Sequence, residues 1–222
     1  MSVINAFLAT LTFEFNKQGK GRIFLLPSHI ATKWDNPHLP PWMATKIAML
    51  KFTWIFAPIH VSNHWILLVA HIPSMSACVL DSLNGDDDTH LENFSKYMKE
   101  RASKTRELDG EWKKNTQLFS GKQENGYSCG DFVMMNALAI SKHVFPNCLN
   151  QENANKMRAF VKQMFLAKGK RSQNCDSCNG RNSSNEWITC DVCGRWYHKN
   201  TTCSSSVTSS TTEWECQICI DN

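Results

Sequence analysis

The chain contains 222 residues, of which 42% are hydrophobic and 20% are charged, with a formal net charge of +4. A chain of this length can form one ordinary domain and a small second one, and its apolar fraction is sufficient for a buried core. The mild positive charge gives no reason to expect direct binding to nucleic acid. No apolar run reaches the length of a membrane span, so we expect no membrane partner.

The segment MSVINAFLATLTFEF has no basic region and reaches Glu14 before the apolar part of a signal peptide could be completed, so we expect no signal peptide. Of the ten cysteines, seven lie from Cys175 onward, in paired spacings that suit a metal better than disulfide bonds. This pattern predicts a reducing compartment, the cytosol or the nucleus. Residues 171–222 hold four Lys/Arg and six Asp/Glu, against 20 and 14 upstream, so the two parts are expected to bind different partners.

The first predicted element is an amphipathic helix that Ser2 can cap. Its apolar face consists of Val3, Ile4, Phe7, Leu8 and Leu11. Residues 27–42 carry four prolines and are predicted to form a long irregular connection. His29 and His38 lie in it, and we interpret both as solvated loop histidines.

Three segments rich in aromatic and β-branched residues follow, at 54–59, 65–72 and 77–83, and we predict that they form the central strands of one sheet. His64 precedes the second strand, and Asp81 lies at the end of the third. In neighbouring antiparallel strands these two positions come out at the same edge. An aspartate there can orient a histidine base.

The acidic run at 86–88 lacks the alternating ligand spacing of a calcium loop, so we assign it to the solvated start of a helix at 89–104. Residues 105–122 are polar apart from an amphipathic stretch around 112–119, which we predict to be an edge segment. A last long helix is predicted at 151–166. Its buried face consists of Met157, Phe160, Val161 and Phe165.

The sequence QENGYSCG at 123–130 contains a turn-forming Asn-Gly pair and leads into a run with helical apolar spacing at 131–143. Cys129 would then lie at a helix N-terminus, where the peptide dipoles favour a thiolate over a thiol. We interpret Cys129 as a nucleophile, and Cys78 and Cys148 as ordinary core cysteines. His64 is the favoured base because a strand follows it and Asp81 lies downstream. The competing histidines are His60, His71, His90 and His143.

These motifs resemble the ubiquitin-like-protein-specific cysteine proteases, the SUMO protease superfamily that includes adenovirus-type proteases. The resemblance rests on H-W before an apolar strand, an aspartate in a D-S-L context, and Q-x-N-G-x-x-C-G, and it covers roughly residues 2–166. It implies a papain-like α+β fold with a central mixed sheet and helices. In that fold His64 is the base, Asp81 orients it, Cys129 attacks and Gln123 donates to the oxyanion.

The resemblance also implies that Trp65 covers the tunnel for the substrate's Gly-Gly tail. A neutral amide six residues before the nucleophile, together with the backbone N–H of Cys129, can stabilise an oxyanion without adding charge. Two departures are present. Ser128 stands where the family usually has aspartate, and the family's W-L-x-D before the first helix is missing, which indicates a fragment or a short copy from a mobile element.

The remaining cysteines predict a separate zinc-binding domain at 175–222, joined by a basic linker at 168–174 to a protease domain at 1–167. Three C-x-x-C pairs, one histidine and one further cysteine provide eight ligands, enough for two closed structural zinc sites. Their order resembles a PHD finger, since a RING would have three cysteines before its histidine. The family's cross-brace implies one zinc on Cys175, Cys178, His198 and Cys203 and a second on Cys190, Cys193, Cys216 and Cys219.

Three tryptophans accompany these ligands. Trp214 is expected to support the second zinc from the core. Trp187 and Trp196 match positions where some PHD fingers build a methyl-lysine cage, a cation–π use of the rings. The alternative is that a small two-zinc module needs these aromatics for packing. The acidic balance of this part fits a basic histone tail, which such modules bind by adding a strand.

We therefore predict a cysteine isopeptidase or endopeptidase that cleaves after Gly-Gly of SUMO or another ubiquitin-like protein, with a PHD finger that recruits it to chromatin. This implies SUMO or other ubiquitin-like conjugates and a histone tail as partners, two structural zinc ions, and a location in the nucleus or in nucleus and cytoplasm. The alternatives are a catalytically inactive chromatin reader or adaptor, and a transposon- or virus-type processing protease. Retention of His64, Asp81, Gln123 and Cys129 together favours an active enzyme.

Overall fold

The computed structural model describes residues 2–19, 21–34, 47–85, 88–169, 174–180, 186–190, 195–200, 202–204, 214–217 and 220. The chain divides into two compact units, Met1–Arg158 and Ala159–Asn222, and each is described by itself. In the described part of the chain, no helix combines the length and apolar character needed to cross a membrane.

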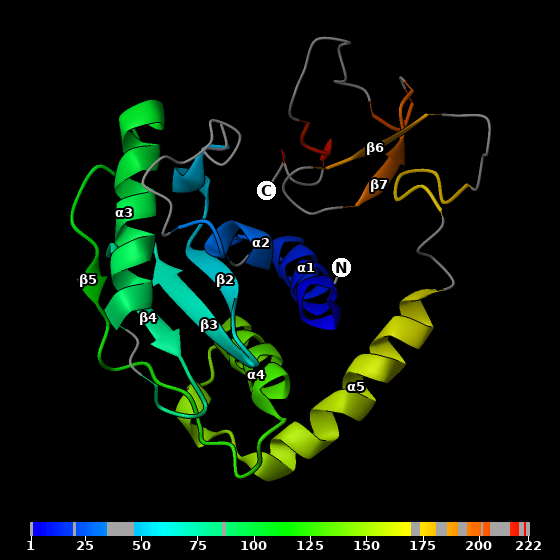
Figure 1. Cartoon of the computed structure of the whole chain (residues 1–222). Helices are drawn as coiled ribbons and strands as arrows, with labels where there is room; N and C mark the ends of the chain where they lie inside the picture. Colours follow the sequence, from blue (N-terminus) through cyan, green and yellow to red (C-terminus); the bar gives the residue numbers. More distant parts are fainter. Residues whose placement is uncertain are drawn as a thin grey trace. The chain divides into compact units, whose positions relative to one another are not determined.

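The first unit contains a five-stranded sheet in the order β1-β2-β3-β4-β5 (Figure 1). Its strands are β1 (Ile23–Leu25), β2 (Trp54–Val61), β3 (His64–His71), β4 (Ser76–Leu80) and β5 (Lys113–Lys114). The pairs β2–β3 and β3–β4 are antiparallel, whereas β1–β2 and β4–β5 are parallel. The sheet is therefore mixed, and the predicted α+β fold class is confirmed for this unit.

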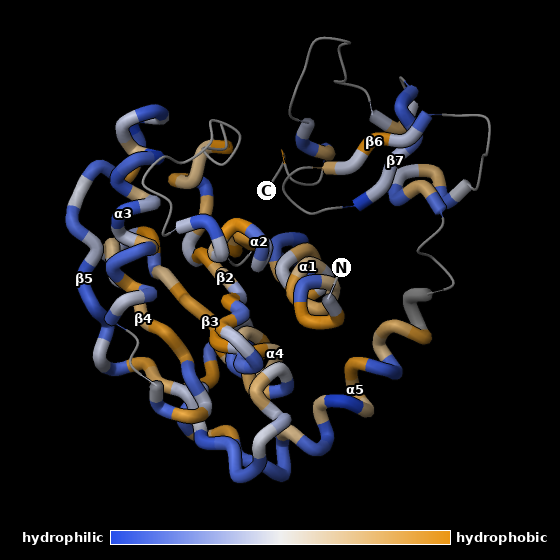
Figure 2. Tube along the Cα trace, viewed as in Figure 1, coloured by the Kyte–Doolittle hydropathy of each residue, from blue (hydrophilic) through white to orange (hydrophobic). Residues whose placement is uncertain are grey.

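Helices pack against the sheet, which explains why the middle of each central strand is apolar and buried. They are α1 (Val3–Asn16), α2 (Ser28–Ala31), α3 (Asp88–Thr105), α4 (Cys129–Ser141), α5 (Gln151–Gly169) and the short 3-10 turns η2 (Met49–Lys51) and η3 (Pro146–Cys148). All five residues from Ile66 to Ala70 are at most 3% exposed, although successive side chains point to opposite faces. Both faces of β3 are therefore buried, and Figure 2 shows the hydrophobic character of this strand.

Most predicted elements are present, with small shifts in their ends. Ser2 caps α1 by accepting a hydrogen bond from the Asn5 backbone N–H at 3.2 Å. The third central strand ends at Leu80 rather than at residue 83, because Asp81 and the residues after it turn to make hydrogen bonds at the end of the sheet. The predicted edge segment is confirmed in β5, which pairs only with β4 in the order of the sheet.

Two predictions about individual residues, Cys148 and Phe160, were wrong, and one concerns a residue outside the described part of the chain. Cys148 is exposed rather than in the core, because it ends the surface turn η3 and its thiol faces the Phe145 carbonyl at 3.0 Å. Phe160 is 46% exposed, since α5 buries only the stripe that includes Met157 and Val161. The predicted irregular region contains the short helix α2, in which His29 is exposed as predicted, while His38 lies outside the described residues.

The second unit contains the C-terminal part of α5 and a two-stranded antiparallel sheet. The strands of this sheet are β6 (Trp187–Thr189) and β7 (Trp196–His198). Its buried aromatic pair is Tyr197 and Trp214, whose rings meet edge to face with centroids 5.1 Å apart. The predicted core position of Trp214 is consistent with its 5% exposure.

Candidate active site and metal cluster

His64 and Asp81 meet at the edge of the sheet as the strand order predicted. β3 begins at His64, and β4 runs antiparallel to it and ends one residue before Asp81. His64 Nε2 lies 2.6 Å from Asp81 Oδ1. The Asp81 side chain is 6% exposed and that of His64 22%, so the pair is sheltered while the imidazole still reaches solvent.

The Asp81 carboxylate is held by the turn that follows it. Its Oδ1 also accepts a hydrogen bond from the Leu83 backbone N–H at 2.8 Å, and its Oδ2 accepts one from the Gly85 N–H at 2.7 Å. Burial opposes ionisation, but the hydrogen bonds from Leu83, His64 and Gly85 and the attraction of His64 hold the pKa of Asp81 below its ordinary value. The group is therefore an anion at neutral pH.

Gly85 allows this turn to close tightly on the carboxylate. A Cβ atom at residue 85 would lie 2.8 Å from Asp81 Oδ2, closer than van der Waals contact permits. A larger residue would therefore push the carboxylate away from His64.

An ionised carboxylate can only accept hydrogen bonds, so Nε2 of His64 must carry the proton that it shares with Asp81. In the neutral imidazole the other ring nitrogen, Nδ1, is then an acceptor. This arrangement fixes His64 in the tautomer that can remove a proton from a thiol.

Cys129 is the first residue of α4 and is 7% exposed. α4 packs against β3, the strand that begins at His64, and against α1. The α1 contact is close at the nucleophile, since a Cβ atom at Gly130 would lie 3.0 Å from Ile4 Cδ1. The prediction that Cys129 occupies a helix N-terminus is confirmed, and its backbone N–H belongs to the first turn, which has no intrahelical acceptor.

Gln123 is held by a residue that sequence reasoning missed, Ser82. The Ser82 hydroxyl donates to Gln123 Oε1 at 2.7 Å, and the Gln123 backbone N–H donates to the Ser82 carbonyl at 3.1 Å. Gln123 Nε2 donates to the Asn125 carbonyl. Because a carbonyl can only accept, these contacts fix which end of the amide carries N–H, and one N–H of Nε2 is left for another acceptor.

The only sequence signal for Ser82 is its place beside Asp81 in D-S-L. Its hydroxyl is buried at 2% exposure, so it links the carboxylate turn to the amide across 41 residues of chain.

The competing histidines lie elsewhere. His60 is exposed on β2 and packs against Trp65, with ring centroids 4.5 Å apart. His71 lies at the other end of β3, where it contacts the Trp54 ring and Ser74. Trp65 is half-buried and follows His64 directly, so it stands beside the candidate base.

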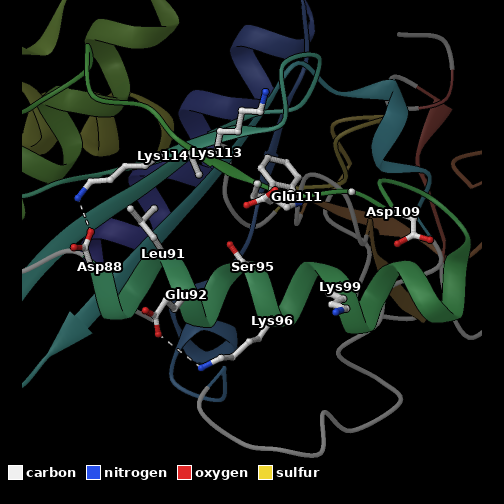
Figure 3. Close-up of a pocket in the computed structure, with 13 residues that line it drawn as sticks. Asp88, Leu91, Glu92, Ser95, Lys96, Lys99, Asp109, Glu111, Lys113 and Lys114 are labelled. Atoms are coloured by element: carbon white, nitrogen blue, oxygen red, sulfur yellow. Dashed lines mark hydrogen bonds and ion pairs between the residues drawn. The ribbon is translucent and has the colours of Figure 1, made fainter.

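A separate pocket of about 640 Å³ lies between α3 and the segment that contains β5 (Figure 3). Four of its charged side chains form ion pairs, Asp88 with Lys114 and Glu92 with Lys96. None of the predicted site residues lines it. The pocket therefore does not bear on the chemistry of Cys129.

In the second unit, Cys175, Cys178, His198 and Cys203 form one cluster whose ligand atoms all lie within 4.8 Å of one another. His198 Nδ1 lies 3.4 Å from Cys178 Sγ and 3.9 Å from Cys203 Sγ. Sulfurs and a ring nitrogen at these separations can surround one tetrahedral ion, and three thiolates with one imidazole are a zinc donor set. The cluster can therefore hold one zinc ion.

Backbone groups also support this cluster. The His198 N–H donates to Cys175 Sγ at 3.3 Å, and the Gly180 N–H donates to Cys178 Sγ at 3.4 Å. Such donors stabilise thiolate ligands. Cys190 and Cys216 are both buried and do not belong to this cluster, and the Cys216 N–H donates to Cys190 Sγ at 3.3 Å. Cys193 and Cys219 lie outside the described residues.

Trp187 and Trp196 lie on neighbouring strands, with Trp187 opposite His198 and Trp196 opposite Thr189. Side chains two residues apart on a strand share a face, so both tryptophans belong to the same face of this small sheet. The Trp187 ring packs on His198 with centroids 4.4 Å apart, whereas Trp196 is 51% exposed. Trp187 thus has a packing role, and Trp196 offers a free aromatic surface.

Comparisons with known proteins agree with this geometry. Ubiquitin-like-specific protease ESD4 of Arabidopsis thaliana is 34% identical over 90 residues, which is 39% of this chain and 18% of that protein. Ubiquitin-like-specific protease 1 of Saccharomyces cerevisiae is 30% identical over 131 residues, which is 56% of this chain and 20% of that protein. The chain thus spans about a fifth of the length of these curated relatives.

Solved structures share the fold. The C-terminal Ulp1 protease domain in complex with Smt3, the yeast ortholog of SUMO, has a TM-score of 0.61 at 24% identity, covering 74% of this chain and 76% of that one. The Ulp1-like SUMO protease catalytic domain of Chaetomium thermophilum has a TM-score of 0.58 at 19% identity, covering 72% and 69%.

The sequence pattern of the Ulp1 protease family, C-terminal catalytic domain, matches residues 2–171. This match spans the sheet, the His64–Asp81 pair and the helix that begins at Cys129. The chain therefore belongs to the Ulp1 protease family.

Proposed function

We propose that the first unit is a cysteine peptidase that cleaves after the Gly-Gly end of SUMO or another ubiquitin-like protein. The observation that carries this proposal is the 2.6 Å contact between His64 Nε2 and Asp81 Oδ1 beside a helix that begins at Cys129. The substrate class is supported by the relatives, which are named ubiquitin-like-specific proteases, and by the solved domain in complex with Smt3.

The first step is activation of the thiol. His64 donates Nε2–H to Asp81, so its Nδ1 is free to accept the proton of Cys129. The imidazolium that forms is stabilised by the Asp81 anion, whose pKa is held low by the hydrogen bonds of its turn. The dipole of α4 favours the resulting thiolate at its N-terminus.

The thiolate then attacks the carbonyl carbon of the last glycine. The developing oxyanion accepts hydrogen bonds from the Cys129 backbone N–H and from the N–H of Gln123 that Asn125 does not use. Collapse of the tetrahedral intermediate breaks the C–N bond, and the His64 imidazolium protonates the leaving amine. Water, deprotonated by the same histidine, hydrolyses the thioester and restores the thiol.

Trp65 is proposed to cover the Gly-Gly tail. Its position after His64 and its partial burial against His60 place an aromatic surface beside the candidate base. A narrow cover would admit glycine and exclude residues with side chains, which would explain selectivity for Gly-Gly.

Release of a fluorophore from the C-terminus of SUMO and of ubiquitin tests this function. We expect the zinc-loaded chain to cleave the SUMO amide, and Cys129→Ala to abolish cleavage. Cys148→Ala is the matched control because this cysteine is exposed on η3, outside the candidate site, and should leave the rate unchanged. Cleavage that survives Cys129→Ala would contradict the assignment.

We further propose that residues 175–222 form a PHD-type finger with two structural zinc ions. In the described cluster, Cys175 Sγ accepts a hydrogen bond from the backbone N–H of His198, a later ligand of the same cluster. Cys190 Sγ accepts an N–H from Cys216 in the same way. This repetition supports a second ion held by Cys190, Cys193, Cys216 and Cys219. Zinc content of the purified chain, expected to be two ions, tests it, and one ion would contradict it.

The finger is proposed to bind a histone tail and so to place the enzyme in the nucleus on chromatin. The exposed face of Trp196, on the same side of the small sheet as Trp187, can form a cation–π contact with a methylated lysine. Fluorescence titration with unmodified and trimethylated histone H3 peptides tests this. We expect Trp196→Ala to weaken binding of the methylated peptide, and equal binding by wild type and variant would overturn the cage.

A further inference from the structure

Helix α5 contacts the turn that carries the nucleophile at several points. Gln151 is its first residue, and its side chain reaches both sides of the turn. Gln151 Oε1 accepts the Glu124 backbone N–H at 3.0 Å, and its Nε2 donates to the Ser128 hydroxyl at 3.0 Å. Glu124 follows Gln123 and Ser128 precedes Cys129, so the Gln151 side chain links the two ends of the segment between them.

Arg158, two turns further along α5, holds the other side of Cys129. Its Nη2 donates to the Tyr127 carbonyl at 3.1 Å, and its guanidinium lies over the Tyr127 ring, 5.3 Å from the centroid. Its Nε donates to Asp131 Oδ2 at 2.8 Å. These contacts reach the residues two before and two after the nucleophile.

The ion pair between Arg158 and Asp131 affects Cys129 because Asp131 is buried near it in the chain. Its side chain is only 6% exposed, and it lies in the first turn of α4, two residues after Cys129. An unpaired carboxylate there would oppose formation of a thiolate. Burial raises the pKa of Asp131, and the hydrogen bond and charge of Arg158 act against that rise. Arg158 thus both neutralises the carboxylate and ties it to α5.

We propose that Gln151 and Arg158 are positioning residues, which fix the spacing between Gln123 and Cys129 and shield the thiolate from the Asp131 charge. The inference rests on the proposed function in taking Cys129 as the nucleophile. Neither residue was singled out from the sequence, because both act from 22 or more residues downstream through side chains of an ordinary amphipathic helix.

The test compares Arg158→Ala, Arg158→Lys and Gln151→Ala in the full zinc-loaded chain. Lys156→Ala is the matched control, because Lys156 lies on the same helix and pairs only at the surface with Glu152. Alkylation of Cys129 by iodoacetamide, followed across pH by mass spectrometry of its peptide, reports the thiolate without needing a substrate. Steady-state cleavage gives kcat and KM separately.

We expect Arg158→Ala to move the alkylation profile to higher pH and to slow alkylation at pH 7 about threefold, since the carboxylate charge is then unpaired. Its kcat should fall about tenfold with little change in KM, because the spacing of reacting groups is disturbed. Adding Asp131→Asn should restore the profile, and Arg158→Lys should preserve it. Gln151→Ala should lower kcat without moving the profile.

Other titratable groups do not change between these variants. On the elements in contact with α4 they are His64 and His71 of β3, Glu14 of α1, Cys148 of η3, and Glu152, Lys156 and Lys162 of α5, of which Lys156 changes only in the control. A shift of the profile in Arg158→Ala that Asp131→Asn reverses therefore reports on this ion pair.

Thermal unfolding identifies any variant that fails to fold. If Arg158→Ala does not fold, the alkylation profile and kcat of Arg158→Lys and Gln151→Ala are compared with those of the wild type instead. Wild-type profiles and kcat in all folded variants would overturn the proposal. Failure of the proposed function looks different, since the wild type would then cleave neither SUMO nor ubiquitin while its Cys129 alkylation still responded to Arg158.

Discussion

The two units gather their functional groups in different ways. In the first, His64 and Asp81 are 17 residues apart and Ser82 reaches Gln123 across 41, and a packed sheet brings them together. In the second, the ligands come in close pairs such as Cys175 and Cys178, and backbone N–H groups aim at their sulfurs. The first unit should therefore depend on apolar packing, and the second on its metal.

Removal of zinc should have the largest effect and should be confined to the second unit. Structural zinc contributes about 10–16 kcal/mol of apparent binding free energy to small modules, which is their folding free energy. With a strong chelator we expect hydrogen exchange of residues 187–189 and 196–198 to become fast while residues 66–70 stay protected. Loss of protection in both segments would contradict the claim that only the second unit depends on zinc.

Asp81→Asn should have the next largest effect, which is on catalysis. The amide cannot stabilise the His64 imidazolium as an anion does, and it can hold the wrong tautomer. We expect kcat to fall by about 10²- to 10⁴-fold. Zinc content should stay unchanged, and steady-state cleavage with metal analysis checks both. A rate within threefold of wild type would be inconsistent with the assigned role.

Leu68→Ala should destabilise the first unit and leave the second intact. Leu68 is fully buried in β3, so the truncation leaves a cavity and costs about 2–5 kcal/mol. Urea unfolding followed by hydrogen exchange should show a lower midpoint for the five-stranded sheet and an unchanged midpoint for residues 187–189 and 196–198. Leu166→Ala is the control, because this leucine is 66% exposed. Equal effects of the two changes would argue against a packed core in β3.

The smallest effect concerns acid stability. Because the folded-state pKa of Asp81 is lowered, its contribution to stability is present above the ordinary carboxyl pKa and is lost as pH falls through the folded value. The difference in unfolding free energy between wild type and Asp81→Asn should therefore shrink as pH falls below about 4. Urea titrations at several pH values measure this difference in unfolding free energy. A difference that grows as the pH falls would contradict the prediction.

Patterns that are local in sequence predicted most of the fold. Three apolar segments separated by short turns predicted neighbouring antiparallel strands, with His64 and Asp81 at one edge of the sheet. Helical spacing of apolar residues predicted that Cys129 lies at the start of a helix. What failed were properties set by distant partners. The pattern could not show that Cys148 is exposed on η3 or that Phe160 faces solvent, because burial depends on what packs against each surface.

The supporting contacts of the site were also invisible in the sequence. Ser82 and Arg158 are ordinary polar residues until the fold brings them to Gln123 and Asp131. By contrast, C-x-x-C spacing alone predicted that Cys175 and Cys178 share a metal, and the resemblance to a PHD finger added His198 and Cys203 to the same set. A site whose residues lie close together in the sequence can be predicted from their spacing. A contact between residues far apart in the sequence is found only from the structure.

The most direct measurement of the central claim is covalent capture of Cys129 by SUMO that ends in propargylamide. The account predicts one adduct, mapped by mass spectrometry to the peptide containing Cys129, absent in Cys129→Ala and strongly slowed in Asp81→Asn. Cys148→Ala should be captured as fast as wild type. Absence of an adduct with both SUMO and ubiquitin probes, or an adduct that persists in Cys129→Ala, would contradict the account.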